Sequence, residues 1–151
     1  MSDVTCAQDP SFDDSDWQEI NLPHDFSLTQ PYTRNGEAES AYKLGGVGWY
    51  RNYFVIDDSL SCRPIELTFE GAYMETEVYV NGHFVGKHLN GYQEFSHDIS
   101  QFVRVGAENL LAVRVENKVP SSRWYSGSGL YREVSLSVLP QLHFVADQVS
   151  L

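Results

Sequence analysis

Apolar and polar residues alternate at every second position along several short stretches of the chain. The pattern is clearest in residues 65–69, 111–115 and 134–138, where Val, Leu, Ile or Phe recurs between smaller or polar residues. An alternation of period two predicts β-strands with one buried and one wetter face. Residues 49–56 are apolar or aromatic on both faces, so we expect them to form a more central strand of a sheet.

An Asn-Gly pair, Asn81 and Gly82, separates two further short strands. Asn-Gly adopts the positive φ angles of a type I′ turn, which predicts a hairpin from residues 78–80 to residues 83–85. No window of a dozen residues has the period of an amphipathic helix. Short strands between clusters of Gly, Asn, Asp and Pro indicate an all-β fold, an antiparallel β-sandwich or jelly roll.

Three aspartates, Asp13, Asp14 and Asp16, precede a further strand that we expect to begin at Trp17. They resemble part of a calcium loop, but the glycine and the closing glutamate of an EF-hand are missing. Because Asp readily hydrogen-bonds its own backbone, a turn is the better interpretation.

Two long irregular stretches, residues 22–47 and 118–130, interrupt the strand pattern. Loops longer than about 12 residues are uncommon in compact domains and are usually functional or disordered. The first contains His24 and Asp25, and the second contains an aromatic and cationic run followed by Ser-Gly-Ser-Gly. Such residues gathered on loops favour a surface that meets a ligand.

The length and charge of the chain exclude several classes of function. Its 151 residues suffice for one domain, whereas a (β/α)₈ barrel needs about 250. Its 21 acidic and 10 basic residues give a net charge of −11, and the basic residues are scattered. Nucleic acids and anionic membranes are bound through clustered Lys and Arg, so we expect neither as a partner. No signal peptide is visible in residues 1–10, and the compartment, periplasmic or cytoplasmic, stays open.

Metal and cofactor sites are not indicated. The five histidines do not form a ligand set by their spacing, so we expect no metal and no cofactor. Cys6 and Cys62 are far apart in sequence, and two unrelated thiols are favoured over a disulfide.

Catalytic motifs are also missing. Residues 126–129 do not fit Gly-x-Ser-x-Gly, because Tyr125 stands where the first glycine belongs. Glycosidases commonly use two carboxylates about 5–10 Å apart, but no candidate pair stands out among the acidic residues. The Asn-Glu dipeptide typical of barrel glycosidases is absent. We therefore predict no catalytic residue in this chain.

The segment RWYSGSGLYR, residues 123–132, is aromatic, cationic and flexible. Sugars are bound by aromatic faces against their C–H patches, and by Arg, Asp or Asn on their hydroxyl groups. The same residues would also suit a packed corner of the fold, since Trp and Tyr are mostly buried. From composition alone, the packed corner is the favoured interpretation.

Eight short motifs resemble, in order, the N-terminal sugar-binding domain of glycoside hydrolase family 2, the family of β-galactosidases, β-glucuronidases and β-mannosidases. The motifs are residues 12–17 (FDDSDW), 22–26 (LPHDF), 48–51 (GWYR), 69–71 (FEG), 78–86, 91–99, 109–115 and 123–132. They span nearly the whole chain. The combination of LPHD with RWYSGSG is most similar to the bacterial β-galactosidase-like branch.

The resemblance implies a jelly-roll β-sandwich, similar to galactose-binding domains, over residues 12–140. Residues 1–11 would be a poorly structured start, and residues 141–151 would lead to an immunoglobulin-like domain. A (β/α)₈ barrel in the intact enzyme would carry the acid/base and nucleophile glutamates of a retaining hydrolase. Relatives usually have an opening strand before residues 12–17, and its absence here would leave an unpaired sheet edge.

The resemblance also implies which residues face a sugar. In the family, this domain lends loops to the rim of the active site and helps to hold the non-reducing sugar. Asp25 would accept hydrogen bonds from sugar hydroxyls, and His24 would position it or donate a bond. Arg123 would orient that loop or meet a sugar oxygen, and Trp124 or Tyr125 would supply a wall. Several branches have an acidic residue where Arg123 stands, and an arginine cannot ligate a metal, so no metal site is implied here.

We therefore expect a non-catalytic sugar-binding domain of a β-galactosidase-like glycoside hydrolase. Its partners would be a β-galactoside-like carbohydrate, the barrel domain of the parent enzyme and, in a homo-oligomer, a second copy. A stand-alone carbohydrate-binding module and a structural or oligomerisation domain are the alternatives.

Overall fold

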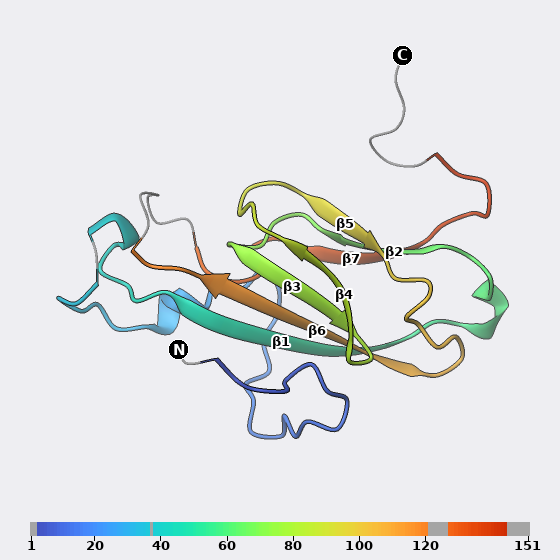
Figure 1. The fold of residues 1–151 in the computed structure, drawn as a ribbon, viewed down its shortest axis with the longest axis horizontal. Coiled ribbons are helices and arrows are strands. Elements are labelled where there is room, and N and C mark those ends of the chain that lie inside the picture. The colour runs from blue at the N-terminus through green and yellow to red at the C-terminus, as the bar shows by residue number, and fades with distance from the viewer. Residues whose placement is uncertain (1–2, 37, 121–126, 145–151) are drawn as a thin grey trace, which may run out of the picture.

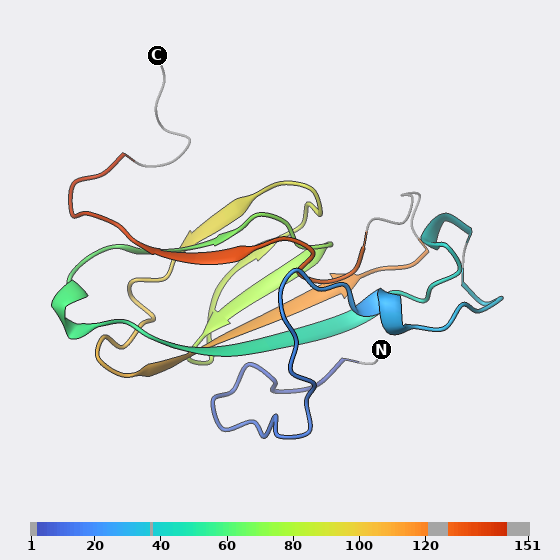
Figure 2. The ribbon, with the colours of Figure 1, turned by 180° about the vertical axis from the view of Figure 1, so that it is seen from behind.

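A computed structural model describes residues 3–36, 38–120 and 127–144, which form two β-sheets lying face to face (Figures 1 and 2). The four-stranded sheet has the order β1 (Gly46–Val55), β6 (Glu108–Asn117), β3 (Glu75–Val80) and β4 (His83–His88). The three-stranded sheet has the order β5 (Phe95–Asp98), β2 (Ile65–Phe69) and β7 (Val134–Val138). Every strand pair is antiparallel, so the predicted all-β sandwich is confirmed.

The helical elements of the described residues are short 3₁₀ turns. They are η1 (Phe26–Thr29), η2 (Ala38–Ser40) and η3 (Asp58–Leu60). Within the described ranges, no helix has the length and hydrophobicity needed to cross a membrane.

The core lies between the sheets and consists of the apolar positions of the alternating stretches. Ile65, Leu67 and Phe69 of β2 are at most 2% exposed, and they belong to one cluster with Val113 and Val115 of β6. Full burial of one such side chain contributes roughly 1.5–3 kcal/mol. The apolar positions of the period-two pattern therefore mark the face of each strand that is buried between the sheets.

The predicted turn between β3 and β4 is confirmed. Asn81 and Gly82 have φ angles of 52° and 82°, both in the left-handed region that a type I′ turn requires. Val80 pairs with His83 across the turn. Asn-Gly is therefore the reason that the chain reverses here within two residues.

The strand β1 lies at the edge of its sheet, so the expectation of a more central strand over residues 49–56 is wrong. The physical reason is that residues 3–16, here called the N-terminal segment, cover the outer face of β1 and β6. Trp49 on β1 and Arg114 on β6 both donate to the carboxylate of Asp3, at 2.9 and 2.8 Å. An edge strand whose outer face is covered, as that of β1 is at Trp49 and Arg51, has the same apolar pattern there as a central strand.

Arg51 holds most of the N-terminal segment. Its side chain is only 2% exposed and forms an ion pair with Asp14, with 2.7 Å between Nε and Oδ2. Its Nη1 donates to the carbonyl oxygens of Ala7 and Asp9, at 2.5 and 3.0 Å. Ala7 is completely buried as a result. The predicted aspartate turn is also present, since Asp13 Oδ1 accepts from the Ser15 amide at 3.0 Å.

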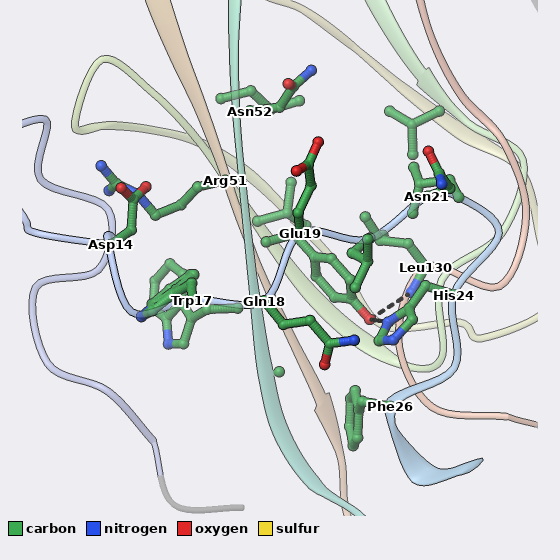
Figure 3. Close-up of a pocket in the computed structure, with 18 of the residues that line it drawn as sticks. Asp14, Trp17, Gln18, Glu19, Asn21, His24, Phe26, Arg51, Asn52 and Leu130 are labelled. Carbon is green, nitrogen blue, oxygen red and sulfur yellow. Dashed lines mark hydrogen bonds and ion pairs between the residues drawn. The ribbon is translucent and has the colours of Figure 1, made fainter. Parts of the chain in front are cut away.

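The strand expected at Trp17 does not form. Residues 18–23 make no backbone hydrogen bond with a described strand, because they cross the gap between β1 and β7 instead of following either edge (Figure 2). Below them lies a groove of about 810 Å³, whose lining includes Leu111 of β6 and Leu136 of β7 (Figure 3). This side of the sandwich is therefore open down to its core.

At the opposite side, aromatic rings and two histidines close the sandwich between β4 and β5. The imidazole of His88 stacks on Phe95 with 4.1 Å between centroids, and His97 lies edge-on to the same ring at 5.7 Å. Nε2 of each histidine is buried and has no partner among the described residues. Burial lowers the pKa of both imidazoles, and the proximity of His88 lowers the pKa of His97 further.

Candidate functional site

Two loop segments, far apart in the sequence, pair with each other at one end of the sandwich. The His24 amide donates to the Leu130 carbonyl at 2.7 Å, and the Phe26 amide donates to the Ser128 carbonyl at 2.9 Å. These bonds form a short antiparallel ladder between residues 24–26 and 128–130. The two irregular stretches singled out in the sequence therefore meet in space.

The second segment is held on its other side by Tyr73. The amide of Tyr73 donates to the Gly129 carbonyl at 2.9 Å, and the Gly129 amide donates back at 3.1 Å. Gly129 has a φ of +118°, and a Cβ at this position would lie 2.1 Å from the hydroxyl oxygen of Tyr50. Only glycine fits, because the backbone angle and the close approach both exclude a side chain.

Asp25 is bound from both segments through one oxygen. Its Oδ1 accepts from the Ser27 amide at 2.9 Å and from the Ser27 hydroxyl at 2.6 Å. The same atom accepts from the Ser128 amide at 2.9 Å. Asp25 is thus the N-cap of η1 and also ties η1 to residues 127–130. These bonds fix the orientation of the carboxylate.

Ser128 extends this network to the end of β6. Its hydroxyl accepts from Asn117 Nδ2 at 2.7 Å, and both side chains are buried. Ser27 and Ser128 are 1% and 0% exposed and are bonded to neighbouring side chains, so neither is presented as a nucleophile. These hydrogen bonds therefore fix the conformation of the two loop segments, which a binding surface requires.

His24 directs its ring away from the Asp25 network and into the groove between β1 and β7. Its Nδ1 lies 3.0 Å from the hydroxyl oxygen of Tyr50, which also accepts from the Leu130 amide at 3.4 Å (Figure 3). Burial, together with the negative charge of Asp25, raises the pKa of Tyr50 to about 12. The Tyr50 hydroxyl is therefore protonated at neutral pH and available as a donor.

The loop that follows η1 is folded back on itself by polar contacts. Gln30 Nε2 donates to the Gly45 carbonyl at 2.8 Å, and the buried ammonium of Lys43 donates to the Gln30 carbonyl at 2.5 Å. The same ammonium lies 4.2 Å from the ring centroid of Tyr32. The loop thus has a defined shape beside the site.

Three of the predicted site residues, Arg123, Trp124 and Tyr125, lie outside the described residues, so their placement stays a prediction. Their loop returns to the described chain at Gly127. A Cβ on Gly127 would lie 3.4 Å from Asp25 Oδ2. The loop predicted to bear the sugar-binding aromatics therefore ends beside Asp25.

Sequence reasoning missed four members of the site: Ser27, Tyr50, Asn117 and Ser128. A signal for Ser27 was present, because Asp followed two residues later by Ser is a common N-cap and Asx-turn pattern. Tyr50 lies in the motif GWYR, residues 48–51, but nothing in that motif marks its hydroxyl as a contact of His24. Nothing local marks Ser128 as a partner of Asp25, 103 residues earlier.

Metal-binding potential is low in the part of the chain that the structure describes. Three or more His, Cys, Asp or Glu side chains do not gather there in a way that could hold a metal ion. Cys6 and Cys62 are both free and exposed.

Comparison with known proteins relates the chain to a family of sugar-binding domains. Residues 8–140 match the family model described as glycosyl hydrolases family 2, sugar binding domain. The chain is 39% identical over 146 residues to the β-galactosidase BoGH2A of Bacteroides ovatus, covering 95% of the chain and 17% of that enzyme. The fold is similar to a glycosyl hydrolase family 2 member from Bacteroides cellulosilyticus, with a TM-score of 0.88, 41% identity and coverage of 91% of this chain and 19% of that one.

A β-glucuronidase from Bacteroides uniformis is also similar, with a TM-score of 0.79, 33% identity and coverage of 91% of this chain and 16% of that one. The chain therefore spans about a fifth or less of the length of these relatives. These relatives include both a β-galactosidase and a β-glucuronidase.

Proposed function

Because the chain belongs to glycosyl hydrolase family 2 as its sugar-binding domain, we propose that it is a non-catalytic part of a β-galactosidase-like enzyme. In this role it lends the loops around Asp25 to the rim of the active site and helps to hold the non-reducing sugar. The bond-breaking glutamates are supplied by a barrel domain of the parent enzyme. The described residues contribute binding and shape.

The observation that carries the proposal is the fixed carboxylate of Asp25. Three donors from two loop segments hold its Oδ1, so the orientation of the carboxylate is set before a sugar arrives. Preorganised polar groups bind with less loss of conformational entropy than mobile ones. Asp25 also lies beside Gly127, where the loop bearing Arg123, Trp124 and Tyr125 ends.

The structure supports one of the two roles considered for His24. Its ring is bonded to Tyr50 in the groove, whereas the adjacent Asp25 is bonded to Ser27 and Ser128. We therefore assign His24 to positioning the backbone that carries Asp25. Direct donation to a sugar hydroxyl would fall to the loop residues Arg123, Trp124 and Tyr125 and to the barrel.

The proposal is tested in a chimera in which residues 3–140, including the N-terminal segment, replace the matching domain of BoGH2A. Asp25→Ala should raise the KM for a β-galactoside at least tenfold. Asp57→Ala is the matched control, since Asp57 caps η3 by the same kind of bond, from the amide of the serine two residues later. An unchanged KM and kcat in the Asp25 variant, with an altered association state, would instead assign the domain to assembly.

A titration of the isolated chain with galactose, lactose and glucuronic acid addresses the remaining alternative. We expect no saturable binding at millimolar sugar, because the site is completed by the barrel. Clear saturable binding would assign the chain to the stand-alone carbohydrate-binding modules.

A further inference from the structure

The hydroxyl group of Tyr50 occupies a singular place in the described structure, because it touches both segments of the site. Its oxygen lies 3.0 Å from His24 Nδ1 in the first segment and 3.4 Å from the Leu130 amide nitrogen in the second. It also lies where a side chain on Gly129 would be. Tyr50 itself belongs to β1, so the hydroxyl connects the sheet to both loops.

The direction of each bond follows from the groups involved. A backbone N–H can only donate, so the Leu130 amide uses one lone pair of the Tyr50 oxygen. The hydroxyl proton then needs an acceptor, and His24 Nδ1 is the one within reach among the described residues. A neutral imidazole that accepts at Nδ1 carries its proton on Nε2.

We propose that Tyr50 is a positioning residue for the Asp25 site, its hydroxyl donating to His24 Nδ1 and accepting from the Leu130 amide. This inference deepens the proposed function and rests on it only for the consequence in sugar binding. The hydroxyl connects the two segments and stabilises the ladder between them. Ser128 belongs to this ladder, and its amide holds Asp25 from the second segment.

The surrounding contacts explain why this connection is needed. Between residues 24–26 and 128–130, the ladder consists of two backbone bonds, from His24 and from Phe26. The Phe26 ring packs against Gly48 of β1, where a Cβ would lie 2.7 Å from the ring. Tyr50 adds the polar contact from the same strand, two residues further on. The Asp25 site therefore takes its position from β1.

The test begins with Tyr50→Phe in the 151-residue chain, which removes the hydroxyl and keeps the ring. In ¹⁵N spectra, His24 Nδ1 should shift downfield towards the value of an imidazole nitrogen without a hydrogen bond. Amide hydrogen exchange should accelerate at Leu130, which loses its acceptor, and at Ser128, which lies on the same ladder. We expect an acceleration of roughly five- to tenfold, the scale of one net hydrogen bond. An unmoved Nδ1 resonance would overturn the proposal.

Tyr79→Phe is the matched control. The Tyr79 hydroxyl donates to Glu77 Oε2 at 3.0 Å on the other face of the four-stranded sheet. Its removal should leave the His24 resonance and both exchange rates unchanged. A similar acceleration in this variant would mean that loss of any tyrosine hydroxyl loosens the domain, which would refute a specific role for Tyr50.

A second variant, His24→Leu, tests the same bond from its other end. It should accelerate exchange at Ser128, and the double variant should be no faster than Tyr50→Phe alone, which already removes this bond and the bond to Leu130. Non-additivity of this kind is the mark of a direct interaction. Multiplied effects would show that the two residues act separately and would contradict the proposal.

The consequence for sugar binding is measured apart from these experiments. In the BoGH2A chimera, Tyr50→Phe should raise the KM roughly fivefold at unchanged kcat, corresponding to one hydrogen bond transmitted through Asp25. If Tyr50→Phe shifts the His24 resonance as expected but Asp25→Ala leaves the KM of the chimera unchanged, the proposed function fails and the role of Tyr50 stands. If Asp25→Ala raises the KM but Tyr50→Phe leaves the His24 resonance unmoved, the role of Tyr50 fails and the proposed function stands.

Discussion

Replacement of Arg51 by methionine should detach the N-terminal segment from the outer face of the four-stranded sheet. Methionine keeps the apolar stem of arginine and loses its charge and its donors. Five bonds disappear. They are the ion pair to Asp14 at 2.7 Å, the bonds to the carbonyls of Ala7 and Asp9 at 2.5 and 3.0 Å, and the bonds from Nη2 to the Phe12 carbonyl at 3.4 Å and the Tyr53 hydroxyl at 3.1 Å. The same change uncovers Ala7, which is fully buried in the folded chain.

The size of the effect follows from how exposed the remaining partners are. Removing one member of a buried ion pair costs about 3–5 kcal/mol, because the other charge stays buried without a partner. The carboxylate of Asp14 is 31% exposed and can regain water, as can carbonyls in a detached segment. We therefore expect the low end of that range, about 3 kcal/mol, or about 6–12 °C in Tm for a chain of this size.

Urea unfolding and limited proteolysis would measure this loss. Arg51→Lys should be intermediate, since it keeps the charge and loses the planar fork. Arg63→Met is the control, because the Arg63 side chain makes no hydrogen bond or ion pair with the described residues. A free energy of unfolding for Arg51→Met within about 0.5 kcal/mol of the parent chain, the range of ordinary surface substitutions, would refute the reasoning.

Three further predictions concern the rest of the sandwich. The pKa values of His88 and His97 are lowered from 6.5 in the folded chain. As the pH falls, these two imidazoles are therefore protonated at a higher pH in the unfolded chain than in the folded one. The free energy of unfolding should be at its full value above about pH 6.5 and decline as the pH falls below it. His97→Phe should reduce this decline, measured by urea titrations at pH 5 and 7.5. An unaltered decline would contradict the assignment of the pH dependence to His97. Gly129→Ala places a Cβ 2.1 Å from the Tyr50 oxygen and should lower the free energy of unfolding by about 2 kcal/mol or more, whereas an unchanged Tm would disprove the close approach. Asn109 is fully buried and donates through Nδ2 to two carbonyls. Asn109→Ala should therefore lower the free energy of unfolding by about 2–4 kcal/mol, measured by thermal unfolding. A loss under 1 kcal/mol would contradict a stabilising role for these two hydrogen bonds.

Local patterns in the sequence were enough to predict the sandwich. Residues 65–69 and 134–138 alternate because each strand buries one face against the other sheet, and this needs no knowledge of the partner. The turn at Asn81 and Gly82 is equally local, since its φ angles are determined by those two residues. These elements came out as predicted for that reason.

Features that depend on distant contacts could not be predicted. β1 has the pattern of a central strand because the N-terminal segment covers it, and that covering depends on where Arg51 finds Asp14. The strand expected at Trp17 is absent because residues 18–23 cross between the edges β1 and β7 without pairing with either. Asp25 was selected for its place in a motif, but its bond to Ser128 is a tertiary contact that no spacing encodes.

The bond between Asp25 and Ser128 also has a consequence for how the domain folds. It closes a loop of 103 residues, and the entropy of closing a loop this long must be met by other contacts first. The site is therefore expected to form late, after both sheets have paired, and to be lost in the same cooperative step as the sheets. A ligand that binds residues 24–26 and 128–130 together would then stabilise the whole domain against unfolding, by about 2.7 kcal/mol at a concentration of 100 times its Kd. Sugars for the assembled enzyme could thus be ranked by thermal shift alone, without any measurement of turnover.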